Sequence, residues 1–411
     1  MTIRARPGPG SGRALFFAAV SLFVFFPPYV SSEEFFYRHE AGDMYRIISR
    51  VKEDVYVDRR LTHRAEILNR IAVEVTGVTG ARGRHRAVFQ TSERASGENG
   101  GRSFQWAREY ESVFDRDRLG YLSIGREYYM PVVRNVPVFP GKDLKPGDTW
   151  TAEGHEMHDF RDSFGIEAPY RIPFTARYSF LGEREWQGAM YPAFSVTYRI
   201  SAEPAPVKGR LWPRRIRGAS DQVVFWDRTT GQPKAYREYF RMIFELSDGR
   251  TVEYRGEAEA EAAGSSRMNR EELAGEIRDE IRDSGIPDAS VRIVDEGITI
   301  SLENIQFLPD SAVLSAAEKE KLDRIGEILL RHAGRDILVS GHTAMAGAAE
   351  GRMRLSQERA AAVADYLILK GVRGADRVVV RGFGAERPLA DNGTEEGMRR
   401  NRRVEITILE N

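Results

Sequence analysis

The chain has 411 residues, with 61 Lys and Arg against 61 Asp and Glu, so its formal net charge is zero. A neutral chain has no global electrostatic attraction to nucleic acid or to an anionic membrane surface. The sequence contains no cysteine, which excludes disulfides, thiolate metal sites and the lipid-acceptor residue of bacterial lipoproteins.

The first 32 residues have the order of a secretory signal peptide. Arg4, Arg6 and Arg13 form a positive segment, the apolar run 14–26 follows, and prolines and small residues end it before the mature chain begins. This run is about two-thirds of the roughly 20 apolar residues that a membrane span needs. We therefore predict a signal peptide over residues 1–32 and an exported protein, with a retained short membrane anchor as the alternative.

Residues 33–256 have the pattern of β structure. In 234–246 the apolar side chains fall on one face and the charged ones on the other, as a half-buried strand requires. The Asp248-Gly249 turn then separates this run from a second strand at 251–254, which predicts a hairpin. We expect one or more all-β domains here, arranged as a sandwich or a small barrel.

Two alternatives for this region stay open. An outer-membrane barrel needs strands of about ten residues with one face continuously apolar, whereas charges interrupt the runs 54–60 and 180–186. This favours a soluble domain over a membrane barrel. A periplasmic carrier of apolar ligands is the other alternative, because the region is rich in aromatic residues. The fragment 155–158, His-Glu-Met-His, is not a metalloprotease motif, and we expect its histidines in a solvated loop.

Strands and helices alternate in the last third of the chain. Residues 257–268, rich in Glu, Ala, Gly and Ser, are predicted to be a linker, and 269–411 a second domain. Leu273, Ile277 and Ile281 have helical spacing, and Ser315 with Glu318 forms a capping box. Further elements are expected at 297–302, 315–332, 336–340, 355–370, 377–380 and 404–409. This order predicts an α/β fold, a mixed sheet with helices on one face.

Five short motifs in this domain occur in the order of a known family. They are Phe307 with Ser311 and Leu314, Gly341-His342-Thr343, Leu355 to Ala360, Gly382 to Pro388, and Asn401 to Glu405. Together they resemble the OmpA-like, peptidoglycan-associated C-terminal domain. The resemblance covers residues 269–411. It implies a non-enzymatic protein of the cell envelope, located in the periplasm and associated with the outer membrane or cell wall, with no cofactor and no metal.

The resemblance also implies a site for the stem peptide of peptidoglycan, centred on its zwitterionic diamino acid. In the family, an aspartate of a GHTD motif meets the ammonium, and an arginine meets the carboxylate through paired hydrogen bonds. Arg359 matches that arginine, but Ala344 replaces the aspartate and Arg352 replaces a usual asparagine. The candidate binding residues are Phe307, Ser311, Thr343, Ala344, Arg352, Leu355, Arg359, Arg402 and Arg403.

The missing aspartate predicts altered binding. Removing one partner of a desolvated charge pair costs about 2–5 kcal/mol, at least tens-fold in affinity. We expect ordinary peptidoglycan binding to be weak, altered or lost. Glu350 is a possible substitute carboxylate, and a different stem-peptide diamine or another anionic envelope partner facing Arg352 and Arg359 is equally open. Of Arg402 and Arg403, we expect one to face the pocket and the other to be solvated. No nucleic-acid partner is expected.

Overall fold

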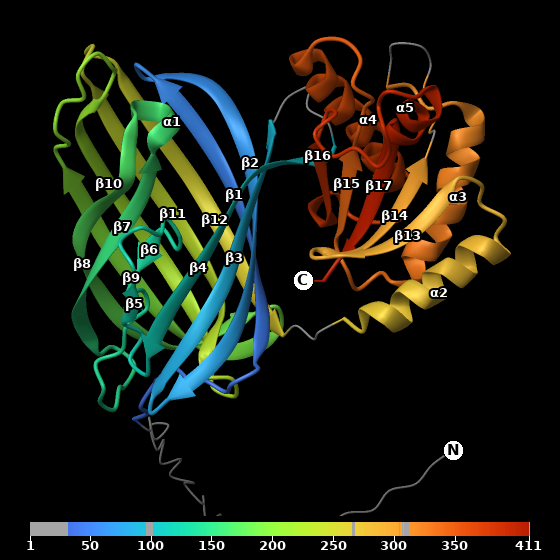
Figure 1. The fold of residues 1–411 in the computed structure, drawn as a ribbon. Coiled ribbons are helices and arrows are strands. Elements are labelled where there is room, and N and C mark those ends of the chain that lie inside the picture. The colour runs from blue at the N-terminus through green and yellow to red at the C-terminus, as the bar shows by residue number, and fades with distance from the viewer. Residues whose placement is uncertain are drawn as a thin grey trace, which may run out of the picture.

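The structure is a computed structural model that describes residues 32–95, 102–264, 268–303, 305, 307 and 312–410. The predicted signal peptide, apart from Ser32, and the candidate site residue Ser311 lie outside these residues. A curled β-sheet and an α/β domain lie side by side (Figure 1). Within the described part of the chain, none of the helices has the length and apolar character needed to cross a membrane.

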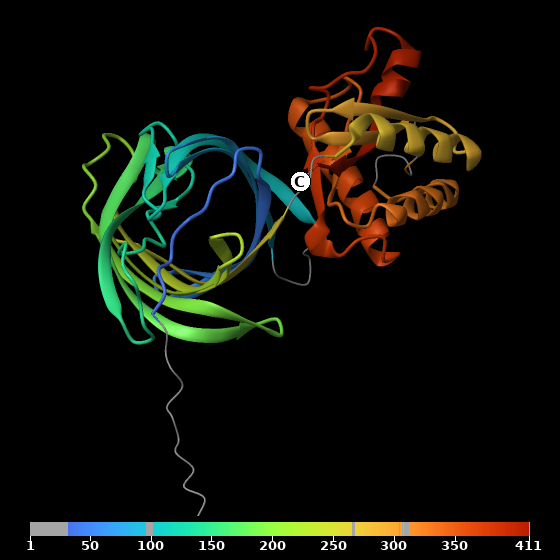
Figure 2. The ribbon, with the colours of Figure 1, turned by 90° about the horizontal axis from the view of Figure 1, so that it is seen from below.

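The N-terminal region is a single antiparallel sheet that curls round on itself, as the view along its strands shows (Figure 2). Its long strands are β1 (Met44–Val57), β2 (Arg60–Thr79), β3 (Arg82–Ala95), β4 (Phe104–Asp117), β7 (Thr149–Phe160), β8 (Ile166–Trp186), β9 (Ala189–Ala202), β10 (Pro213–Asp227), β11 (Gln232–Leu246) and β12 (Thr251–Gly264). Its short elements are β5 (Leu122–Ile124), β6 (Val133–Arg134) and α1 (Arg161–Phe164). Because β1 pairs with both β2 and β12, the first and last strands of the region are neighbours.

The all-β prediction for this region is confirmed. The predicted hairpin joins β11 to β12, with Gly249 at φ +91° in the turn, a conformation that glycine adopts without strain. Alternation along the strands places one set of side chains inside the curl and the other outside. The sheet is continuous from β6 through β1 to β5, so the region is one curled sheet and not a sandwich of two stacked sheets.

The prediction of a linker from residue 257 was wrong for its first eight residues. Glu257–Gly264 continue β12 and pair with β1 on one side and, through Glu261, with β11 on the other. Ala and Glu are poor strand formers, which hid the strand in the sequence. Here two neighbouring strands supply the ladder, and the alternation places Ala258 and Ala260 in buried positions.

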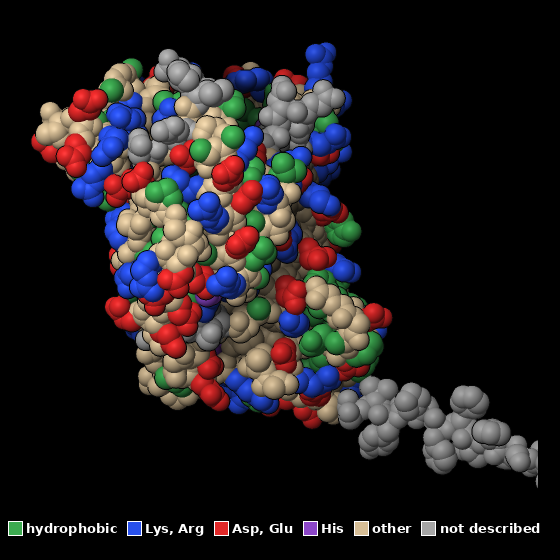
Figure 3. Space-filling view, turned by 90° about the vertical axis from the view of Figure 1, so that its right-hand side faces the viewer, with side chains coloured by type: hydrophobic (Ala, Val, Ile, Leu, Met, Phe, Trp, Pro, Cys, Tyr) green, Lys and Arg blue, Asp and Glu red, His purple; other side chains and the backbone are tan. Residues whose placement is uncertain are grey.

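The C-terminal domain confirms the predicted α/β fold with its mixed sheet. Its elements are α2 (Arg270–Asp283), β13 (Ala289–Val294), β14 (Gly297–Glu303), α3 (Ala316–Arg331), β15 (Ile337–Gly341), α4 (Ala349–Leu369), η1 (Ala375–Arg377), β16 (Val378–Gly382), α5 (Glu395–Asn401) and β17 (Arg403–Leu409). The strand order is β13-β14-β17-β15-β16, in which β15 and β16 are parallel and the other pairs antiparallel. On the outward side of this domain, acidic and basic side chains are interspersed (Figure 3).

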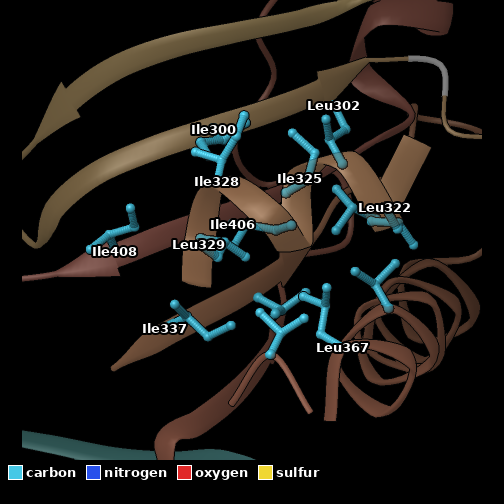
Figure 4. Packing of buried hydrophobic residues seen from close by; sticks show 14 of the residues in the cluster. Ile300, Leu302, Leu322, Ile325, Ile328, Leu329, Ile337, Leu367, Ile406 and Ile408 are labelled. Atoms are coloured by element: carbon cyan, nitrogen blue, oxygen red, sulfur yellow. The ribbon is translucent and has the colours of Figure 1, made fainter. Parts of the chain in front are cut away.

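One apolar core joins the three long helices to one face of this sheet. Leu322, Ile325 and Leu329 of α3 point towards Ile300 and Ile406 of the sheet (Figure 4). Buried residues of α2 and α4 belong to the same cluster, so the helices cover one face, as expected. Full burial of each such aliphatic side chain contributes about 1.5–3 kcal/mol, and this layer therefore fixes the positions of the loops at the strand ends.

The opposite face of the sheet contacts the N-terminal region. Parallel pairing joins Val379 of β16 to Phe104 of β4, which extends the sheet across the two regions. Nearby, the buried carboxylate of Asp336 accepts a hydrogen bond from Nε of Arg70 in β2 at 3.0 Å. Trp106 packs against a small apolar cluster on this face. Pairing, a buried charge pair and an aromatic contact together fix the C-terminal domain against the curled sheet.

Candidate functional site

The candidate site lies where β15 and β16 end beneath the first turns of α4. A Cβ atom at Gly341 would lie 2.0 Å from the backbone oxygen of Ser356, and one at Gly382 would lie 2.7 Å from the backbone nitrogen of Gln357. Only glycine allows the helix to approach the strand ends so closely. Ser356 then secures the following turn, because its Oγ accepts a hydrogen bond from the Gly384 amide at 2.9 Å.

Two backbone contacts hold the loop between β15 and α4. The Thr343 amide donates to the Gly384 carbonyl at 2.8 Å, and the Met345 amide donates to Oδ1 of Asn392 at 3.0 Å. Asn392 is in turn held by the fully buried Asn401, whose side-chain amide donates to it at 3.0 Å. Asn401 and Asn392 therefore position the loop. The sequence motif around residue 401 contained this signal, although Asn401 was not among the predicted site residues.

The loop presents a methyl group at the position where the resemblance led us to expect an aspartate. Ala344 is 4% exposed, and its neighbour Thr343 is 7% exposed. The Oγ1 of Thr343 is buried and has no hydrogen-bond partner among the described residues. Glu350, considered as a substitute, is an exposed residue in the first turn of α4.

The structure brings Phe307 and Arg359 together from distant parts of the sequence. The guanidinium carbon of Arg359, on α4, lies 4.9 Å from the centre of the Phe307 ring, within the range of a cation–π interaction. One turn earlier on the same helix, Leu355 is half-buried. Arg352 donates a hydrogen bond to the carbonyl of Gly347 in the preceding loop, and its Nε is buried without a hydrogen-bond partner among the residues that the structure describes. The first half of α4 thus carries the guanidinium groups of Arg352 and Arg359, together with that of the exposed Arg354.

The two arginines at the start of β17 have different environments. Arg402 is exposed, whereas Arg403 is 3% exposed. The Arg403 guanidinium donates to Oε1 of Glu405 at 2.6 Å and to the Arg387 carbonyl at 3.0 Å. Burial opposes ionisation of Glu405, but the hydrogen bonds and charges of His342 and Arg403 outweigh it and lower its pKa to about 2. Arg403 therefore belongs to a buried ion pair on the sheet.

The arrangement combines cationic side chains with buried polar atoms that have no hydrogen-bond partner in the described part of the chain. Across the described ranges, no cluster of three or more His, Asp or Glu side chains is placed to hold a metal ion. Thr343, Arg352 and Arg359 bring hydrogen-bonding and positively charged groups to this part of the domain.

Comparison with known proteins identifies the domain. The model of the OmpA family matches residues 306–402. The chain is 37% identical over 133 residues to the probable lipoprotein YiaD of Escherichia coli, covering 32% of this chain and 59% of YiaD. It is 35% identical to the peptidoglycan-associated lipoprotein of Pseudomonas aeruginosa, covering 30% of this chain and 71% of that protein.

Among solved structures, the cell wall anchor of the type VI secretion system (T6SS) from Pseudomonas aeruginosa matches with 31% identity and a TM-score of 0.29. That match covers 34% of this chain and 99% of the anchor. These similarities involve between about a quarter and a third of the chain, and the chain spans 59% of YiaD. Through this C-terminal segment, the chain belongs to the OmpA family.

Proposed function

We propose that the protein is an exported binding or scaffold protein of the cell envelope, located in the periplasm and associated with the outer membrane or cell wall. In this proposal its C-terminal domain keeps the architecture of a peptidoglycan-binding domain but has a changed ligand site. The relatives support the first part, since one is named for its association with peptidoglycan and another is a cell wall anchor. The second part depends on the loop that follows β15.

The observation that carries the proposal is the buried methyl group of Ala344. A diamino acid presents an ammonium and a carboxylate, and a site for both needs an anion as well as a cation. Arg359 supplies the cation, but Ala344 cannot supply the anion. Leaving a desolvated ammonium without its partner costs about 2–5 kcal/mol. Ordinary stem peptides are therefore bound at least about thirty-fold more weakly.

Arg352 supports this conclusion because it adds a further positive charge about two helical turns before Arg359 on α4. A ligand that fits two guanidinium groups carries a net negative charge, as a carboxylate-rich or phosphate-bearing envelope polymer does. The buried Oγ1 of Thr343 offers a hydrogen bond to the same ligand. We therefore favour an anionic envelope partner over a diamine.

Retention on purified sacculi tests the proposal. The full chain is incubated with sacculi and sedimented, in parallel with A344D and its isosteric neutral control A344N. We expect little retention of the unchanged chain and of A344N, and about thirty-fold tighter binding of A344D, because the aspartate restores the missing charge.

A second pair of variants identifies which arginine acts. R359A removes the proposed carboxylate partner, whereas R354A removes an arginine of the same helix whose side chain is 78% exposed. If the unchanged chain is retained strongly and R359A but not R354A abolishes that retention, another acidic group completes the site and the proposal is wrong.

A further inference from the structure

The curled sheet of the N-terminal region encloses a cavity of about 620 Å³. This volume falls within the range of about 300–1,000 Å³ that is typical of small-molecule sites. The space lies where the inward positions of β12 become small: Ala258, Ala260 and Ala262 line it, with Ser49 of β1 beside them. In other parts of the curl, packed aromatic clusters occupy the interior.

Most of the cavity wall is apolar. One part of it is formed by aliphatic side chains of β1 and β2, which point inwards at alternate positions. They include Ile47, Val51, Ile67, Ile71 and Val73. Such a wall fits the hydrocarbon part of a ligand and offers it no hydrogen bonds.

Two groups of hydrogen-bonded polar side chains line this otherwise apolar space. Oε1 of Glu156 accepts a hydrogen bond from the Tyr198 hydroxyl at 2.9 Å, and Oε2 lies 2.7 Å from Nε2 of His158. On the neighbouring strands, Glu238 accepts hydrogen bonds from Ser220 at 2.6 Å and from Gln222 at 3.1 Å. All six side chains line the cavity.

Two of these residues come from the fragment 155–158. The prediction that its histidines lie in a solvated loop was wrong. Glu156 and His158 lie in β7, where Glu156 is 6% exposed. Pairing with β8 places them on the inside of the curl, a position that the polar sequence did not indicate.

The cavity is lined by three carboxylates, of Glu53, Glu156 and Glu238, and by three Lys or Arg side chains, but these charges are not paired with one another. Of its basic residues, Lys234 pairs with Glu261 at 2.8 Å and Arg241 pairs with Glu253 at 2.5 Å. Arg116 stacks on the ring of Tyr37 at 4.8 Å. Among the described residues, Glu238 has only neutral hydrogen-bond donors and no ion-pair partner.

Glu53, near one end of the cavity, also has no ion-pair partner among those residues. Burial and the charge of Glu93 raise the pKa of Glu53 to about 7, and burial with the charge of Glu156 raises the pKa of Glu238. Burying a carboxylate without a cation is costly, and such a group inside a cavity is a mark of a binding site.

We propose that this cavity is a binding site for a single-chain amphipathic amine, whose ammonium group pairs with Glu238 and Glu156 while its apolar body fills the aliphatic wall. An ammonium supplies the positive charge that Glu238 lacks and donates the hydrogen bonds that carboxylate oxygens accept. A fatty acid would place its carboxylate beside those of Glu156 and Glu238. A fatty alcohol would leave the charge of Glu238 unpaired.

This inference goes beyond the proposed function, because it concerns a part of the chain that the OmpA family model does not cover. Calorimetric titration of the full chain tests it with dodecylamine, dodecanol and dodecanoate as probes, the two ionic probes below their micellar concentrations and dodecanol below its solubility limit. We expect saturable one-to-one binding of dodecylamine, weaker binding of dodecanol and no binding of dodecanoate.

Three variants connect this selectivity to the structure. E238Q keeps the size of the side chain but removes its charge, so we expect dodecylamine to bind about thirty-fold more weakly while dodecanol binds as before. A260F fills the cavity from β12 and should abolish binding of both. E259Q is the matched control for the loss of a carboxylate. Glu259 lies on β12 next to Ala260, pairs with Arg237 and has a side chain that is 53% exposed. E259Q should bind like the unchanged chain.

The proposal is overturned if dodecylamine shows no saturable binding, if dodecanoate binds as tightly, or if E238Q keeps the preference for the amine over the alcohol. Circular dichroism of each variant identifies a folding failure, and E238Q then decides the outcome where A260F does not fold. Because sacculus retention depends on Arg359 and residue 344, failure here leaves that experiment unaffected.

Discussion

The contact between the N-terminal sheet and the C-terminal domain can be tested at one buried carboxylate, that of Asp336. Asp336 accepts hydrogen bonds from Nε of Arg70 at 3.0 Å and from Nε of Arg377 at 2.8 Å. The side chains of Arg70 and Asp336 are 2% and 5% exposed. D336A leaves the Arg70 guanidinium buried without its counter-charge, and we expect the free energy of unfolding to fall by about 3–5 kcal/mol.

An exposed ion pair at the same contact provides the matched control. Arg50 pairs with Asp376, but the two side chains are 55% and 36% exposed. Solvent screens such a pair, so R50A should cost less than about 1 kcal/mol. Urea unfolding of the full chain measures both values, and hydrogen exchange at the amides of β4 and β16 shows whether the loss is at the contact.

The double variant R70L/D336L separates the burial of charge from the loss of packing. Replacing both partners of a buried pair by apolar residues is often nearly neutral, so this variant should recover most of the stability that D336A loses. The reasoning is refuted if D336A costs no more than R50A, or if the double variant costs as much as the sum of its single substitutions.

Three further predictions concern single side chains. The pKa of Glu53 is raised to about 7 from 4.5, so between these pH values the folded state holds a proton that the unfolded state releases. The free energy of unfolding should therefore fall as the pH rises from about 4.5 to 7. Urea titrations at several pH values measure this slope, and E53Q should flatten it. S315A removes the cap of α3, whose Oγ accepts from the Glu318 amide at 3.3 Å, and should lower the unfolding free energy by about 1 kcal/mol; no change in the urea midpoint would contradict this. G341A forces a Cβ against the Ser356 carbonyl and should destabilise the C-terminal domain by about 3 kcal/mol or more, seen as a lower thermal midpoint.

The elements that the sequence predicted were those with strong local signals. Ser315 is the N-cap of α3, as its capping box indicated, and the turn at Gly249 joins two strands of alternating pattern. Where local signals were weak, the prediction failed. α4 begins at Ala349, six residues before the expected start, and its N-cap Ala348 makes no side-chain hydrogen bond. β13 and α5 were not expected.

The candidate site was predictable only through its motifs. The resemblance identified Arg359 and Phe307, and the structure brings these two side chains together. The supporting contacts of Asn392 and Asn401 join residues whose proximity depends on the fold of the loops. The cavity could not be predicted, because Ala258 and Ala260 become a wall only when pairing with β1 and β11 sets which face points inwards.

The shared ladder between β4 and β16 has a practical consequence for dissecting this molecule. Separating the two regions between β12 and α2 would expose Trp106 to solvent and leave the guanidinium of Arg70 without the carboxylate of Asp336. Each half produced alone would thus expose apolar and charged groups that are buried in the whole protein. Fragments of the N-terminal region should be made with Trp106 and Arg70 replaced by small polar residues. Binding that is seen only with the unmodified fragments is then an artefact of the newly exposed surface.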